Sequence, residues 1–178
     1  MKYCEECGAP VRFTIPAGDQ LPRHVCEACG HIHYRNPRLV VGCVPEHEER
    51  ILLCRRAIEP RRGYWTVPAG FMENGETLQQ AAARESHEEA LAEVTIGSLL
   101  AVVHVLHAEQ VHVFFRARLA DARYAAGAES LEVALVAPSD IPWADIAFRS
   151  TDFALRRYLQ DKATGGEPYH FHTIDQRP

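Results

Sequence analysis

Three features that would direct a protein to a membrane or to nucleic acid are missing from this sequence of 178 residues. No apolar run approaches the roughly 18 residues that a membrane-spanning helix needs, and the starting segment MKYCEECGAP contains no apolar signal-peptide core. Positive charge is not in excess, because 19 Lys and Arg stand against 24 Asp and Glu, for a net charge of −5. Broad binding to nucleic acid needs a basic face. We therefore expect a cytoplasmic protein with no membrane contact and no nucleic-acid partner, although a nucleotide substrate is not excluded.

Internal repeats are also missing, and the length suits one ordinary domain with a small appendage. A composition shift at Asn36-Pro37 marks the first boundary. We predict a small metal-binding unit over residues 1–36, a main domain over 37–160 and a polar, irregular tail over 161–178.

Cysteine is present in a pattern that predicts a metal site. Two C-x-x-C pairs, each followed by glycine, supply four of the six cysteines: Cys4, Cys7, Cys26 and Cys29. Without an export signal, such pairs indicate metal ligands and not disulfides. Four thiolates predict a closed tetrahedral zinc site with a structural role, and a segment this short needs the metal to fold. A redox pair is the alternative, and His24, His31 and His33 are expected to be bystanders.

Acidic residues crowd the end of a predicted helix. The helix begins near Thr77, where Gln80 three residues later completes a capping box. Glu85, Glu88 and Glu89 then fall within an arc of about 100° on the helix. Their mutual repulsion, at the negative end of the helix dipole, is relieved best by a hard divalent cation such as Mg²⁺ or Mn²⁺.

The segments around this helix have the composition of strands. Apolar, β-branched runs predict strands at 39–44, 51–54, 94–106, 111–119 and 131–136, and a C-terminal helix is expected over 151–160. Strands and helices without strict βαβ alternation predict an α/β (α+β) fold, a mixed sheet flanked by helices.

The loop before the helix contains four arginines, Arg55, Arg56, Arg61 and Arg62. Two interpretations stay open: a solvated basic loop, or a clamp for an anionic ligand near the carboxylates.

The stretch from Gly70 to Ala92 resembles the signature of the Nudix hydrolases, G-x5-E-x7-R-E-U-x-E-E-x-G-U with U aliphatic. Six residues match at the required spacings: Gly70, Glu76, Arg84, Glu85, Glu88 and Glu89. Two positions depart from it, because Ser86 replaces an aliphatic residue and Leu91 stands where the signature has glycine. The departures put the end of the helix in question and not the chemistry.

The resemblance implies an α/β/α sandwich that hydrolyses a nucleoside diphosphate linked to another group. It further implies that Glu85, Glu88, Glu89 and the Gly70 carbonyl hold Mg²⁺ or Mn²⁺, and that Arg84 braces the carboxylates. A general base often lies outside the signature in this family. Glu129 and Glu132, in the segment GAESLE, are the candidates, unless a signature glutamate serves as base itself.

Beyond the signature, residues 3–160 resemble a Nudix subgroup with an N-terminal zinc ribbon, whose members are called ADP-ribose or FAD pyrophosphatases. FAD or ADP-ribose is therefore the expected substrate, giving two monophosphates. No SQPWPFPxS-like array follows the signature, which disfavours an NADH pyrophosphatase, and HVLHAEQ lacks the proline common in ADP-ribose enzymes. A non-catalytic nucleotide- or nucleic-acid-binding module is the other alternative, and a homodimer is expected only by family analogy.

Overall fold

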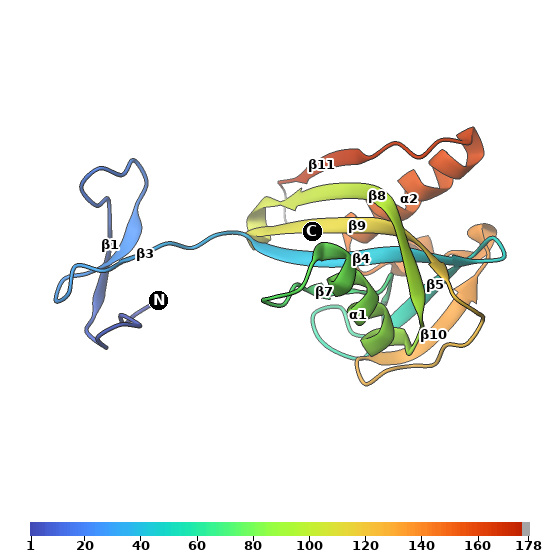
Figure 1. The fold of residues 1–178 in the computed structure, drawn as a ribbon, viewed down its shortest axis with the longest axis horizontal. Helices are drawn as coiled ribbons and strands as arrows, with labels where there is room; N and C mark the ends of the chain where they lie inside the picture. Colours follow the sequence, from blue (N-terminus) through green and yellow to red (C-terminus); the bar gives the residue numbers. More distant parts are fainter. Residues whose placement is uncertain (176–178) are drawn as a thin grey trace. The chain divides into compact units, whose positions relative to one another are not determined.

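The computed structural model describes residues 1–175, which form two compact units. The first unit is Met1–Pro37, and the second begins at Arg38 (Figure 1). Each is described by itself below. Within residues 1–175, no helix combines the length and apolar character needed to cross a membrane.

The first unit is a three-stranded antiparallel sheet with very little core. Its strands are β1 (Val11–Thr14), β2 (Arg23–Cys26) and β3 (Ile32–His33), in that order. The buried side chains among residues 1–37 are Cys4, Cys26 and His33. So few buried groups cannot offset the chain entropy lost on folding, which agrees with a need for metal.

The second unit contains one mixed sheet of eight strands. The main path runs β10-β5-β4-β9-β8-β11, with β6 added to β5 and β7 added to β4. The pairs β4–β9 and β8–β11 are parallel, and the others are antiparallel. The strands are β4 (Arg38–His47), β5 (Arg50–Arg56), β6 (Trp65–Thr66), β7 (Ala69–Phe71), β8 (Val94–Val105), β9 (Gln110–Leu119), β10 (Ser130–Val136) and β11 (His170–Ile174).

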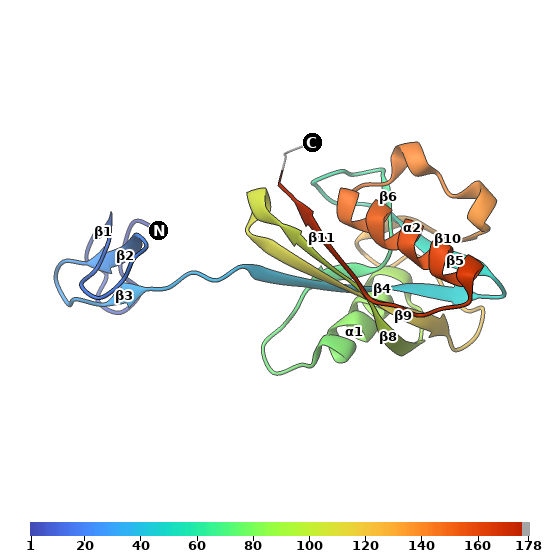
Figure 2. The ribbon, with the colours of Figure 1, turned by 90° about the horizontal axis from the view of Figure 1, so that it is seen from above.

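Two helices cover opposite faces of this sheet, as Figure 2 shows. Alternation along β9 explains the arrangement, since Val113 and Phe115 pack in the cluster under α1 (Leu78–Ala90). Phe114 faces the other way, into the cluster under α2 (Arg149–Thr164). Three short 3-10 turns complete the unit: η1 (Leu106–Ala108), η2 (Pro138–Asp140) and η3 (Trp143–Asp145). The predicted α/β sandwich with a mixed sheet is confirmed.

Strands β4 and β5 separate soon after their hairpin. They pair only at Glu46–Ile51 and His47–Arg50. Beyond that point β4 pairs with β7 and β5 pairs with β6, so the sheet opens between them. This opening brings α1, on one face, into contact with a cavity that extends over the other face.

Both ends of α1 follow from local chemistry. The Thr77 side chain accepts from the Gln80 N–H and the Gln80 side chain accepts from the Thr77 N–H, the predicted capping box. The helix ends after Ala90, and Leu91 adopts a left-handed conformation with φ 45°. The missing signature glycine therefore leaves the helix end in place, with Leu91 accepting the strain that glycine would avoid.

The prediction of an irregular tail over 161–178 is wrong for its described part, and residues 176–178 lie outside the described residues. Helix α2 continues to Thr164, and His170–Ile174 forms β11 beside β8. Buried Arg116 holds the connection, because it pairs with Asp161 and donates to the Pro168 carbonyl at 2.8 Å. The strand was missed because only Ile174 in it is buried, so its sequence shows no apolar alternation.

Candidate active site

Gly70 and Glu85 lie in contact at the opening between β4 and β5. A Cβ built on Gly70 would lie 2.4 Å from the Glu85 carboxylate, closer than atoms can approach. Glycine is therefore required here by space and not by backbone conformation, since its φ is not positive. The packing of β7 on α1 places the Gly70 backbone beside this carboxylate.

Arg84 connects the carboxylates to the loop that precedes α1. Its guanidinium donates to both Glu76 oxygens, at 3.0 and 2.8 Å, and to the Phe71 carbonyl at 3.0 Å. The same side chain donates to Glu85 at 2.8 Å and to Glu88 at 3.1 Å. With so many bonds to the protein, Arg84 orients the carboxylates and lowers the pKa of Glu76.

Glu89 lies deepest of the three carboxylates. It accepts a hydrogen bond from the Ala69 N–H at 3.1 Å and is 6% exposed. Burial raises the pKa of Glu89 to about 8, against the opposing effect of that hydrogen bond. Burial also raises the pKa of Glu85, where Arg84 opposes it, whereas Glu88 is exposed. Buried carboxylates of this kind favour a neutralising cation.

The loop before β10 docks on the end of α1. The N–H groups of Ala125 and Gly127 donate to the Ala90 and Glu89 carbonyls, at 2.9 and 3.1 Å, and so satisfy the last turn of the helix. A Cβ on Gly127 would lie 1.8 Å from the Glu88 carbonyl oxygen, so only glycine permits this docking. The loop thereby places Glu129 on the wall of the cavity beside the carboxylates.

Glu132, the other candidate base, lies elsewhere. It belongs to β10, where its side chain is 3.6 Å from Arg55, and it does not line the cavity. Of the four loop arginines, Arg56 and Arg61 line the cavity and Arg55 and Arg62 do not.

The carboxylates and the residues around them line a single large cavity of about 1270 Å³. Its wall includes all three carboxylates, Gly70 and Arg84, and continues past β9 to β11. Arg56 stacks on Phe148 at 5.0 Å, and Arg61 stacks on Tyr64 at 5.3 Å. The cavity exceeds the roughly 300–1,000 Å³ of ordinary small-molecule sites, so it has room for a large ligand.

The donor set suits a hard cation. Carboxylate oxygens and a backbone carbonyl are ligands that Mg²⁺ and Mn²⁺ prefer. The Glu85 carboxylate occupies the space that a Gly70 side chain would fill, so it lies directly against the Gly70 backbone. The chemistry of these donors therefore suits the ion that the signature implies.

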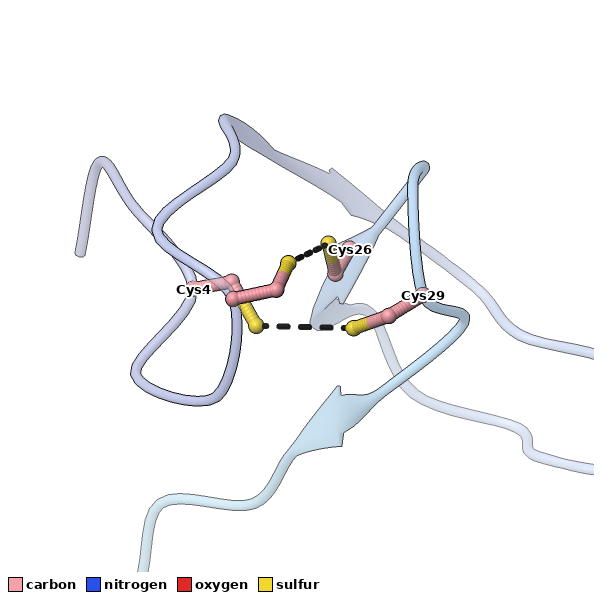
Figure 3. A group of neighbouring side chains, drawn as sticks. Cys4, Cys26 and Cys29 are labelled. Atoms are coloured by element: carbon pink, nitrogen blue, oxygen red, sulfur yellow. Dashed lines mark hydrogen bonds between the residues drawn. The ribbon is translucent and has the colours of Figure 1, made fainter.

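The four ribbon cysteines come together as predicted from their spacing. Their sulfur atoms all lie within 4.8 Å of one another. The Sγ atoms of Cys4 and Cys29, joined by a dashed line in Figure 3, are 3.7 Å apart. Those of Cys7 and Cys26 are 3.5 Å apart. Zinc–sulfur bonds of about 2.3 Å in a tetrahedron imply sulfur separations of about 3.8 Å, so the cluster fits zinc. His31 and His33 belong to a separate group with Glu5.

Some contacts of the site had no sequence signal. Ser86, in place of an aliphatic residue, is fully buried, donates to the Ala82 carbonyl at 2.8 Å and meets Cys43 at 3.2 Å. The small polar pair Ser86–Cys43 thus replaces an apolar contact. Cavity residues from distant segments, such as Gln110, His112 and Ile174, were also missed. Only the sheet register brings them to the same wall.

Comparison with known families agrees with this geometry. Residues 2–35 match the Nudix N-terminal zinc-ribbon family, and residues 36–157 match the NUDIX domain family. The chain therefore belongs to the Nudix hydrolase family, in the subgroup that carries an N-terminal zinc ribbon. A solved Nudix hydrolase from Nitrosomonas europaea is similar over nearly the whole chain, with 51% identity, a TM-score of 0.96, and coverage of 99% of this chain and 100% of that one.

Curated relatives match over shorter stretches. The NAD-capped RNA hydrolase NudC of Edwardsiella ictaluri is 38% identical over 93 residues, which are 52% of this chain and 34% of that protein. The ADP-ribose pyrophosphatase of Methanocaldococcus jannaschii is 38% identical over 69 residues, 39% of this chain and 41% of that one. The matches to these curated relatives thus span less than half of their length.

Proposed function

We propose that this chain hydrolyses the diphosphate bond of a nucleoside diphosphate linked to a second group, with FAD or ADP-ribose as substrate. One observation carries the proposal: Glu85, Glu88 and Glu89 face the same cavity as the Gly70 backbone, and Arg84 holds two of them in place. A complete carboxylate set of this kind argues against a non-catalytic binding module.

In the proposed reaction, a water oxygen attacks one phosphorus, the bridging P–O bond breaks, and two monophosphates leave. Glu85, Glu88, Glu89 and the Gly70 carbonyl would hold Mg²⁺ or Mn²⁺, which would supply Lewis acidity and lower the pKa of the attacking water. Glu129 is the proposed acceptor of the water proton, because it lines the cavity and Glu132 does not. Arg56 and Arg61 balance the charge of the phosphates.

The substrate classes follow from cavity size and from the relatives. A volume of about 1270 Å³ accommodates both halves of FAD or ADP-ribose. A nicotinamide dinucleotide is the second candidate, favoured by similarity to proteins named NAD-capped RNA hydrolase. RNA itself is not proposed, since basic and acidic residues are balanced in the ribbon: Lys2, Arg12, Arg23 and Arg35 against Glu5, Glu6, Asp19 and Glu27.

The ribbon is proposed to bind one structural Zn²⁺ through Cys4, Cys7, Cys26 and Cys29, which are free thiols. The cytoplasm is the proposed location, because thiol ligands persist in a reducing compartment. A homodimer is proposed by analogy with the family, and light scattering tests it directly.

The test of function is a substrate panel with Mg²⁺ and purified protein, with products separated by chromatography. Wild-type protein is expected to cleave FAD or ADP-ribose to two monophosphates. Glu89→Gln should lower kcat by at least about 10²-fold, since it removes a charged metal ligand. Glu93→Gln, at an exposed site, is the matched control.

Glu129→Gln separates the candidate bases. We expect it to lower kcat by about 10²-fold with KM little changed. A larger loss in Glu132→Gln would reverse the assignment. No cleavage of any nucleoside diphosphate derivative would refute the proposed function.

A further inference from the structure

A chain of hydrogen bonds connects β9 to the start of α2 along the cavity wall. Gln110 Oε1 lies 2.9 Å from His112 Nε2, and His112 Nδ1 lies 2.9 Å from Ser150 Oγ. All three residues line the cavity, and His112 and Ser150 are buried. The proposed phosphate chemistry uses none of them.

In this chain of hydrogen bonds, the role of each atom as donor or acceptor follows from that of its neighbour. An amide oxygen only accepts, so the Nε2 of His112 carries the hydrogen. Burial lowers the pKa of His112 to about 4, which keeps the ring neutral, and its Nδ1 therefore accepts from the Ser150 hydroxyl. The Gln110 amide is held with its oxygen toward His112 and its NH₂ group away from it.

That NH₂ group has no acceptor among residues 1–175. Gln110 is half-buried and lines the cavity, so its amide hydrogens are available to a ligand. An oriented donor of this kind discriminates between ligands, since a ligand with no acceptor leaves it unpaired.

Gln110 lies at a distance from the carboxylates that suits one arm of a diphosphate ester. Gly70 pairs with Val41 on β4, and Gln110 pairs with Arg38 on the same strand. Three residues along a strand are about 10 Å, and two strand spacings are about 10 Å, which separates the two backbones by roughly 14 Å. A group joined to the diphosphate through a ribose or ribityl chain can bridge that distance.

The side chains beside Gln110 on the two neighbouring strands are apolar. Val105 lies opposite Gln110 on β8, and Ile174 lies opposite Val105 on β11. Both are buried and line the cavity together with Ala108. A sugar hydroxyl placed against these apolar side chains would lack a partner, whereas a flat heterocycle with one or two polar atoms would pack on them.

We propose that Gln110 is a specificity-determining residue, whose amide N–H donates to a ring carbonyl, a ring nitrogen or a carboxamide oxygen on a heterocycle joined to the diphosphate. Ser150 and His112 are positioning residues that orient this amide. The inference rests on the proposed function and narrows its substrate class to diphosphates of the FAD or NADH type over ADP-ribose.

The experiment compares kcat/KM for FAD, NADH and ADP-ribose, which share the AMP half. In Gln110→Leu, the ratio of kcat/KM for FAD or NADH to that for ADP-ribose should fall about tenfold, as expected for one neutral hydrogen bond. Gln79→Leu, on the exposed surface of α1, is the matched control and should leave the ratio unchanged.

Gln110→Glu distinguishes recognition from structural support. A carboxylate still accepts from His112 but presents no N–H to the ligand, so it should lower the ratio as Gln110→Leu does. Ser150→Ala removes the hydrogen bond between α2 and His112. It should also lower the ratio, but by a smaller factor than Gln110→Leu.

Three results would overturn the inference while leaving the proposed function intact. They are an equal loss for all three substrates, recovery of the ratio in Gln110→Glu, and a wild-type preference for ADP-ribose. If the wild-type protein cleaves no substrate, the proposed function itself fails.

Discussion

Residues 1–37 bury three side chains, Cys4, Cys26 and His33, whereas the unit that begins at Arg38 buries three apolar clusters around eight strands. Both units also contain proposed metal ligands, but in opposite surroundings. The ribbon brings together four thiolates with no other core, and the second unit arranges carboxylates on a scaffold that folds without them.

This difference separates two uses of metal. Four sulfur ligands complete a tetrahedral shell, so the proposed zinc has no open position and acts by stabilising the fold. Carboxylates at the edge of a cavity leave positions free for water and phosphate oxygens. Burial raises the pKa of both Glu89 and Glu85. Keeping these two carboxylates in place therefore lowers the stability of the folded unit.

The largest predicted effect tests whether metal replaces a core in the ribbon. Cys26→Ser should abolish zinc binding and unfold residues 1–37, because zinc contributes on the order of 10 kcal/mol to such a fold. Metal analysis and amide hydrogen exchange measure both. The second unit should keep its own cooperative unfolding transition, since its clusters contain only its own residues. If Cys26→Ser also abolished the unfolding transition of the second unit, the conclusion that this unit folds independently of the ribbon would be wrong.

The next effect concerns the carboxylate scaffold. Gly70→Ala places a methyl group where the Glu85 carboxylate lies, so Glu85 or β7 must move. We expect a loss of about 10²-fold in kcat, as for other displacements of catalytic groups by about 1 Å, with a cost of about 1–3 kcal/mol in stability. Gly166→Ala is the control, because its Cβ would make an ordinary 3.5 Å contact. Full activity in Gly70→Ala would disprove the close packing.

A smaller effect depends on pH. The folded-state pKa of His112 is about 4, below the value of about 6.5 for an exposed histidine. Its contribution to stability is therefore complete above pH 6.5 and is lost as pH falls toward 4. Between pH 7 and pH 5, wild-type protein should lose about 2 kcal/mol more than His112→Phe.

Denaturant unfolding at the two pH values measures this difference. NMR of the His112 ring checks it without a substitution: the ring should remain neutral at pH 5. Protonation near pH 6.5 would show that the site is more open to water than the structure indicates.

The smallest effect concerns left-handed residues. The ribbon uses Gly8 and Gly30 at φ 72° and 75°, while α1 ends on Leu91 at φ 45°. Leu91→Gly should stabilise the second unit by about 0.5 kcal/mol, since relief of strain exceeds the added chain entropy. Ala83→Gly, within α1, should instead cost about 1 kcal/mol. Thermal unfolding distinguishes them, and equal destabilisation by both would show that Leu91 is unstrained.

Local patterns predicted much of the fold. The capping box at Thr77 and Gln80, the strands around β4, β5, β8 and β9, and the cysteine cluster all follow from residues close in sequence. Strand β11 did not follow, because its pairing depends on Arg116 and Asp161, which lie 45 residues apart. The roles of the site residues remain proposals. Their placement singles out Glu129 over Glu132 and Arg56 and Arg61 over their neighbours.

The sequence by itself determined the Nudix signature, its helix and the two sets of proposed metal ligands, because ligand spacing within a helix or a knuckle is a local property. Only the tertiary structure decided how far the cavity extends and what lines its far end. Gln110, His112, Ser150 and Ile174 come from three separate elements. Strand register and the packing of α2 bring them together, and no pattern along the chain encodes that proximity.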